Sequence, residues 1–190
     1  MTLKHGFKAN AERTAKRYRQ ELALSSADPL DPRALAGHLK VAIVDASTLV
    51  PLTELEELER IQAYSFSAAT FEIRDRKIIV VNPIRGRGRQ NSDIAHELSH
   101  IILEHDLSEV RELAGMPFRT CKPDEEEEAT ALGGTLLLPR DLLISAARRG
   151  ASIEGIADQY SVTVEMARFR YNTTGVAKQV ATAGRATRSR

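Results

Sequence analysis

The stretch "IAHELSHIILEH", Ile94 to His105, decides the fold of this chain. Within it His96 and His100 stand four residues apart, so on an α-helix both imidazoles lie on one face about one turn apart. Two nitrogen ligands in that arrangement can reach one tetrahedral zinc ion. Glu97 lies close enough to activate a water molecule beside the ion without binding the metal itself. The stretch therefore predicts a metal-binding helix with a general base.

The same helix also has a reason to fold without a metal. Its apolar residues recur at the i, i+4, i+7 and i+8 positions and predict a stripe that packs on a core; they are Ile94, Leu98, Ile101 and Ile102. Asn91 or Ser92 is expected to cap the helix. His105 lies nine residues after His96, about 180° around a continuous helix. We expect His105 to be a helix-end residue rather than a ligand.

A third ligand is expected from "DEEEEATALGGTLLLP", residues 124–139, because a catalytic zinc takes three protein ligands and one open position. Apolar and small residues of this segment recur at helical spacing and predict an inward face: Ala129, Leu132, Gly133 and Leu136. Gly133 and Gly134 would permit close approach to the first helix. Spacing alone leaves Glu125, Glu126 and Glu128 open as the ligand. The other carboxylates are expected only to favour the positive end of their own helix.

Elsewhere the sequence predicts alternating helices and strands. Two β-rich runs, 68–73 and 77–82, flank a polar tripeptide and indicate an antiparallel hairpin. Residues 41–46 have the pattern of a buried strand, and Thr53 has the chemistry of a helix N-cap. Further helices are expected at 8–24, from Asp31, after Pro139 and around 152–171.

Composition excludes several classes of protein. No apolar run approaches the roughly 20 residues that a membrane span needs, and the first residues lack the pattern of a secretory signal. The lone Cys121 can form neither an internal disulfide nor a CxxC zinc site. We therefore expect a cytoplasmic protein without membrane contact, built around one main core.

Residues 152–171, "SIEGIADQYSVTVEMARFRY", have the pattern of two short helices around a turn, with Ser161 where glycine is usual in a helix-turn-helix. One interpretation is DNA binding through Arg168 and Arg170, backed by a basic tail. The other is a helical hairpin that packs on the core or docks a protein substrate. The few basic residues on the second helix favour the packed hairpin.

Two segments carry a resemblance to a known family. "NPIRGRGRQNSDIAHELSHIILEH" and "EEEEATALGGTLLLP" resemble the ImmA/IrrE family of metallo-endopeptidases, in which a strand and an arginine-rich loop precede an HExxH helix. "GFKANAERTAKRYRQELAL" and "GIADQYSVTVEMARFRYN" are also similar, so the resemblance covers most of the chain. Aligning Ala129 and the Leu-Leu-Pro ending at Pro139 places the family's metal-binding glutamate at Glu126. Thr130 stands where the family has Asn or Asp, and is the candidate to orient a ligand histidine.

The resemblance implies a fold and its division along the chain. The expected fold is α+β and zincin-like, with a small antiparallel sheet packed by helices, over residues 1–150. A helix-turn-helix-like hairpin over 151–175 would pack on it, and residues 176–190 would form a flexible basic tail.

The resemblance also implies an activity and a ligand set. A gluzincin-like endopeptidase would bind zinc, with manganese as the alternative, through His96, His100 and Glu126, and would use Glu97 as the base. Its substrate would be a helix-turn-helix repressor of a stress response or mobile element. The loop arginines are Arg85, Arg87 and Arg89. They would then select an acidic protein surface. The alternative is a solvated loop whose conformation one of these arginines fixes.

Two other classes of protein remain open. A DNA-binding regulator would use residues 152–190 and leave the metal site vestigial, and its DNA affinity would depend on salt. A toxin–antitoxin partner would act by association, so it would bind its target stoichiometrically without cleaving it.

Overall fold

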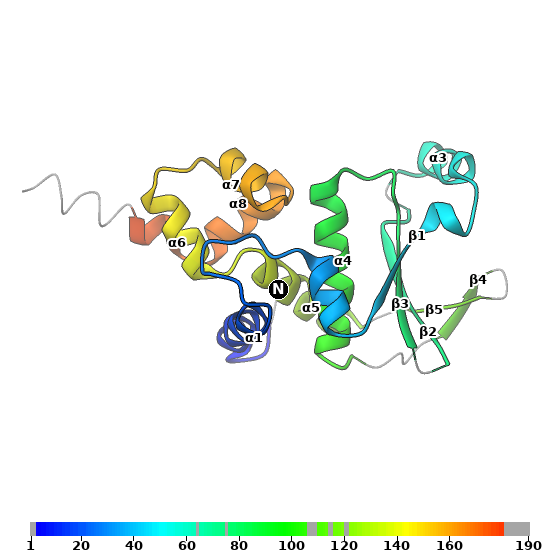
Figure 1. Ribbon diagram of the computed structural model, residues 1–190, viewed down its shortest axis with the longest axis horizontal. Coiled ribbons are helices and arrows are strands. Elements are labelled where there is room, and N and C mark those ends of the chain that lie inside the picture. Colours follow the sequence, from blue (N-terminus) through cyan, green and yellow to red (C-terminus); the bar gives the residue numbers. More distant parts are fainter. Residues whose placement is uncertain are drawn as a thin grey trace, which may run out of the picture.

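The computed structural model describes residues 3–63, 65–74, 76–105, 110–113, 116–119 and 122–180, and has the α+β class that the sequence predicts. The helices are α1 (Phe7–Glu21), α2 (Pro32–His38), α3 (Leu52–Ile61), α4 (Arg87–Ile102), α5 (Pro123–Leu137), α6 (Arg140–Arg148), α7 (Ile153–Tyr160) and α8 (Val164–Thr173). The strands are β1 (Ala42–Asp45), β2 (Ala68–Ile73), β3 (Arg76–Val81), β4 (Val110–Leu113) and β5 (Met116–Arg119). In Figure 1, α4 stands between the three-stranded sheet on one side and a group of helices on the other, which contains α1, α5, α6, α7 and α8.

The main sheet has the strand order β1-β3-β2. The predicted hairpin is confirmed, since β2 pairs antiparallel to β3. However, β1 runs parallel to β3, so this sheet is mixed, whereas β4 and β5 form a separate two-stranded antiparallel sheet. The prediction of a buried strand at 41–46 is wrong, because β1 is an edge strand whose residues are exposed or half-buried. A short apolar run cannot distinguish an edge strand from a central one.

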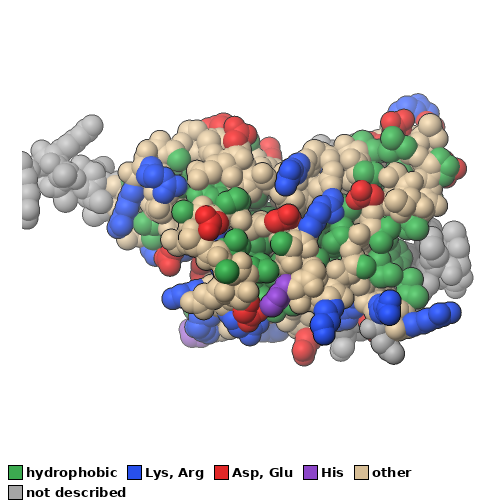
Figure 2. All heavy atoms as spheres, viewed as in Figure 1, with side chains coloured by type: hydrophobic (Ala, Val, Ile, Leu, Met, Phe, Trp, Pro, Cys, Tyr) green, Lys and Arg blue, Asp and Glu red, His purple; other side chains and the backbone are tan. Residues whose placement is uncertain are grey.

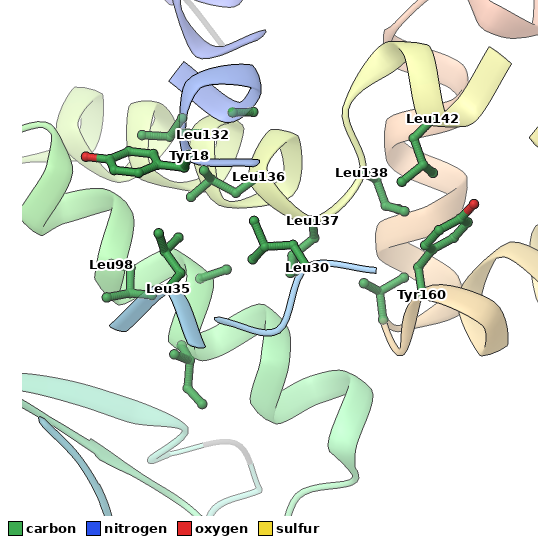
Figure 3. Packing of buried hydrophobic residues seen from close by; sticks show 14 of the residues in the cluster. Tyr18, Leu30, Leu35, Leu98, Leu132, Leu136, Leu137, Leu138, Leu142 and Tyr160 are labelled. Atoms are coloured by element: carbon green, nitrogen blue, oxygen red, sulfur yellow. The ribbon is translucent and has the colours of Figure 1, made fainter. Parts of the chain in front are cut away.

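The main core lies where α4 and α5 meet the helices on either side of them. Leu98 of α4 points toward Leu35 of α2, while Leu132 and Leu136 of α5 approach Tyr18 of α1 (Figure 3). The four leucines are fully buried. The predicted inward faces of the two central helices are therefore confirmed, and each helix is held rigidly by apolar contacts.

Helix α4 begins earlier than its sequence suggests. It starts at Arg87, not at Asn91 or Ser92. A Cβ on Gly88 would lie 2.8 Å from the carbonyl carbon of Val162, so only glycine lets the turn before α8 approach this closely. The Asn91 side chain donates a hydrogen bond to the Ser161 carbonyl at 2.9 Å instead of capping the helix. The end of the arginine-rich loop is thus a helical turn anchored to the C-terminal hairpin.

Helix α3 corrects a second capping prediction. It begins at Leu52 after Pro51, and Thr53 is not its N-cap. Pro51 occupies the N-cap position in an extended conformation, and it has no side chain that could accept a hydrogen bond from the first turn. Leu55 is buried as predicted, whereas Leu58 is 41% exposed.

The C-terminal hairpin packs on the main core, and a buried arginine adds polar contacts. Arg170 of α8 donates from Nε to the Leu138 carbonyl at 3.1 Å and from Nη2 to Glu12 of α1 at 2.9 Å. Ser161 in the turn has a left-handed φ of 50°. Val176 is fully buried in the main core, so packed structure continues past residue 175. The rest of the predicted tail, 181–190, lies outside the described residues. Among the described residues, no helix is long and apolar enough to cross a membrane.

Candidate metal centre

The three predicted ligands come together on the side of α4 that faces α5. The Nε2 atoms of His96 and His100 lie 3.1 Å apart. Glu126 Oε2 is 3.2 Å from His96 Nε2, and its Oε1 is 3.5 Å from His100 Nε2. One ligand atom can be chosen from each of the three side chains so that all three atoms lie within 4.8 Å of one another.

This donor set fits a divalent ion. Two imidazole nitrogens bound at about 2.0–2.1 Å in tetrahedral geometry lie about 3.4 Å from each other. The observed separation of 3.1 Å between the His96 and His100 nitrogens is close to that value. Two histidines and one carboxylate are also a donor set found in catalytic zinc sites. The three residues are therefore a candidate site for zinc.

Glycine at position 133 brings the ligands together. A Cβ there would lie 3.1 Å from both the Ala95 carbonyl oxygen and the His96 backbone nitrogen. The backbones of α4 and α5 can therefore approach at this point as predicted, and Glu126 is carried toward the histidines. Gly134 has a different role, since its Cβ would meet Met166 and Arg170 of α8 rather than α4.

The two histidines differ in exposure and share negatively charged surroundings. The His100 side chain is 3% exposed and that of His96 is 28% exposed. Burial acts to lower the pKa of His96, but the hydrogen bond to Glu126 and the charges of Glu97 and Glu126 together raise this pKa above its ordinary value. The site therefore favours a positive charge at His96, which a proton or a metal cation can supply.

Glu97 is held in place by a residue from the sheet. Thr70 of β2, itself buried, donates from Oγ1 to Glu97 Oε2 at 2.5 Å. Glu97 and His96 line a cleft of about 620 Å³, which is bounded by β2, α4, α5 and the start of α8. The sequence could not indicate Thr70, because it lies 27 residues away on a strand.

Thr130, the predicted support for a ligand histidine, lies on the wall of this cleft. Within the described residues it forms no hydrogen bond to His96 or His100. The ring that lies against His100 is instead that of His105, with 2.9 Å between their Nδ1 atoms. His105 Nε2 lies in turn 3.3 Å from Glu128 Oε2. The structure therefore offers a different pair of residues for the supporting role.

His105 reaches this position because α4 does not continue to it. The helix ends at Ile102, and Glu104 adopts a left-handed φ of 54° that reverses the chain. The backbone nitrogen of His105 donates to the His100 carbonyl at 3.1 Å, so the ring folds back onto His100. The separation of about 180° between His96 and His105 that is expected on a continuous helix therefore does not apply. The sequence did not indicate this turn, because its left-handed residue is a glutamate where glycine is usual.

The three loop arginines occupy different environments. Arg85 forms a bidentate pair with Glu59 of α3, at 2.8 and 2.6 Å, and so fixes the loop. Arg87 is exposed at the first turn of α4. Arg89 forms an ion pair with Asp93 at 3.0 Å and lines the cleft. Arg89 is therefore the one of the three that is placed to meet a ligand in the cleft.

Comparison with known proteins defines the class of this chain. Residues 56–172, more than half of the chain, match the Peptidase_M78 family, described as the IrrE N-terminal-like domain. The chain belongs to this family, and the family resemblance seen in its sequence is confirmed.

A solved structure of a Mycobacterium tuberculosis transcriptional regulator has a similar fold, with a TM-score of 0.50 and 16% sequence identity. The match covers 87% of this chain and 46% of the other, so the chain spans less than half the length of that protein. Comparison with curated proteins gave no match.

Proposed function

We propose that this chain is a metal-dependent endopeptidase that cleaves a helix-turn-helix repressor. His96, His100 and Glu126 would hold one divalent ion, zinc or alternatively manganese, and Glu97 would be the general base. The observation that carries the proposal is the convergence of three ligand atoms within 4.8 Å of one another, next to an open cleft that His96 and Glu97 line. Membership of a peptidase family supports the same conclusion.

The chemistry would follow from these side chains. When bound, zinc supplies Lewis-acid activation of a water molecule and of the scissile carbonyl. Glu97 would take a proton from the attacking water as its oxygen adds to the carbonyl carbon, and then deliver that proton to the amide nitrogen as the C–N bond breaks. The hydrogen bond from Thr70 orients the Glu97 carboxylate for both transfers.

The cleft suits a segment of protein chain better than a small molecule. It is open, and residues at the start of β2 and of α8 line it together with His96 and Glu97. Met166 and Phe169 of α8 give one wall apolar surface, and Arg89 adds a positive charge. The repressor as substrate rests on the family resemblance, and it agrees with the similar structure, which is described as a transcriptional regulator.

The contacts of α8 weigh against the alternative of a DNA-binding hairpin. Arg170 is buried in its pair with Glu12, and Arg168 lies 3.5 Å from Glu154. The first turn of α8 contributes Thr163 and Glu165 to the cleft rather than a basic surface. Acidic and basic side chains are also interspersed over the face in Figure 2. A DNA-binding protein needs a concentrated basic patch, so the packed hairpin is the better supported interpretation.

Cleavage of a repressor by the metal-loaded protein tests the proposal. The wild-type chain would be incubated with small helix-turn-helix repressors encoded near its gene, and the products identified by mass spectrometry. Glu97→Gln should lower the cleavage rate by about 10²- to 10⁴-fold, because the general base is lost, while metal content stays unchanged. Glu154→Gln makes the same chemical change on the exposed surface of α7 and should leave cleavage intact. Undiminished cleavage by Glu97→Gln would rule out this mechanism.

A further inference from the structure

A line of buried polar groups continues from His100 away from the cleft. His100 Nδ1 lies 2.9 Å from His105 Nδ1, and His105 Nε2 lies 3.3 Å from Glu128 Oε2. The three side chains are only 3%, 7% and 9% exposed. Buried polar groups at these distances share hydrogen bonds. Each proton in the line must therefore have a definite position.

The carboxylate at the end of the line decides where those protons lie. Glu128 can only accept a hydrogen bond while it is ionised, so His105 must carry its proton on Nε2. The Nδ1 atom of His105 is then an acceptor, and His100 must donate to it from its own Nδ1. The lone pair on the Nε2 atom of His100 then points toward His96 and Glu126, the side on which an ion would bind.

The opposite assignment fails at Glu128. If His100 carried its proton on Nε2, its Nδ1 atom would be the acceptor and His105 would have to donate from Nδ1. The unprotonated Nε2 of a neutral His105 would then face a carboxylate oxygen 3.3 Å away, with two acceptors opposed. Two opposed acceptors in a buried position are costly. The chosen assignment also turns a lone pair toward a carboxylate, because Glu126 Oε1 lies 3.5 Å from His100 Nε2, but the Glu126 side chain is 47% exposed and water screens that opposition. The opposition at buried Glu128 is the costlier one, so the geometry favours the tautomer of His100 that is ready to bind a metal.

We propose that His105 and Glu128 are positioning residues, which fix the tautomer and the ring orientation of His100 for metal binding. This inference rests on the proposed metal site. Lys4 Nζ lies 3.1 Å from Glu128 Oε1, but its side chain is 74% exposed. The lysine end of this pair is open to water, where an ion pair contributes little, so the effect belongs mainly to the buried contact between Glu128 and His105.

Zinc affinity of the full chain, measured by competition with a chelator, tests the inference. His105→Ala and Glu128→Ala should each weaken zinc binding by about 10- to 100-fold, the usual effect of removing a partner that orients a metal-binding histidine. Because Glu128 acts through His105, the double variant should bind zinc no more weakly than His105→Ala. Glu128→Gln retains an acceptor and should lie closer to wild type than Glu128→Ala.

A second histidine–glutamate pair supplies the matched control. His38 Nε2 lies 2.8 Å from Glu21 Oε2, away from the candidate site. His38→Ala should leave zinc affinity unchanged.

Nitrogen-15 spectra of the metal-free protein report the tautomer of each histidine, which a general loss of stability would not change. His100 should carry its proton on Nδ1 in the wild type and become a mixture of tautomers in His105→Ala, at a temperature where both are folded.

Three results would contradict the inference. Zinc affinity of His105→Ala equal to that of wild type would remove the positioning role while leaving the proposed peptidase intact. A further loss in the double variant would show that Glu128 acts independently of His105. A wild-type chain that binds no zinc or manganese would overturn both the inference and the proposed function.

Discussion

A hydroxyl group from the sheet helps to set the direction of the Glu97 carboxylate. Thr70 comes from the edge strand β2, and its hydrogen bond to Glu97 joins the sheet to the candidate catalytic helix. A hydrogen bond to a charged group contributes about 1.5–3 kcal/mol. This hydrogen bond therefore helps to orient the proposed base from outside its own helix.

Replacing this hydroxyl should slow cleavage without affecting the metal. Thr70→Val has nearly the same shape but cannot donate, so we expect the rate to fall roughly 10- to 100-fold, as the loss of such a bond implies. Thr70→Ser keeps the donor and should retain most of the activity. Steady-state kinetics and metal content of both variants check this. Equal rates for Thr70→Val and wild type would show that Glu97 needs no such support.

Sequence reasoning reached part of the site because that part is local. The spacing of His96, Glu97 and His100 on one helix needs no tertiary information. Glu126 was chosen by family alignment, since spacing alone left its neighbours open. Thr70 and His105 could not be identified, because one depends on strand packing and the other on a left-handed turn at Glu104.

The contact between α4 and α5 depends on the absence of a side chain at Gly133. The atoms that a Cβ would meet there are backbone atoms of Ala95 and His96 in a buried helix, and such atoms cannot move aside cheaply. The contact therefore fixes both the stability of the pair and the position of a proposed ligand.

Gly133→Ala should destabilise the fold by about 1–3 kcal/mol, the usual cost of overpacking, even though alanine is the better helix former. Gly37→Ala in α2 meets nothing within 4 Å and is the matched control, which should be neutral or stabilising. Urea denaturation of the metal-free proteins measures both. If Gly133→Ala is as stable as Gly37→Ala, the two helices are not packed this closely.

The boundaries of helices were harder to predict than the helices themselves. The two β-rich runs around a polar tripeptide are a local signal, and they correctly predict the hairpin of β2 and β3. The predicted start of α4 was wrong because Asn91 donates its hydrogen bond to a distant partner, the Ser161 carbonyl. A residue that could cap a helix locally was used for a contact between elements, which single-sequence reasoning cannot see.

Arg170 connects distant parts of the whole chain. Its guanidinium joins α8 to Glu12 near the N-terminus and to the carbonyl that follows α5. The side chain is 9% exposed, and burial lowers the pKa of this arginine despite the nearby Glu12. The hairpin is therefore held to the core by a buried charged contact, which is costly to break on one side only.

Removing this contact should lower the free energy of unfolding. Arg170→Met should cost about 1–3 kcal/mol, because the buried Leu138 carbonyl and Glu12 both lose a charged donor. Arg168→Met, on the exposed face of the same helix, should change stability by less than about 0.5 kcal/mol. Thermal and urea unfolding compare the two. Similar stabilities would indicate that the hairpin does not depend on this contact.

The central claim is that His96, His100 and Glu126 bind one divalent ion. The most direct measurement is the metal content of the purified chain and of its glutamine variants, after loading with zinc and removal of the excess. We predict one zinc per wild-type chain, loss of that zinc in Glu126→Gln, and retention in Glu125→Gln. A wild-type chain without stoichiometric metal, or a Glu126→Gln variant that keeps it fully, would contradict the account.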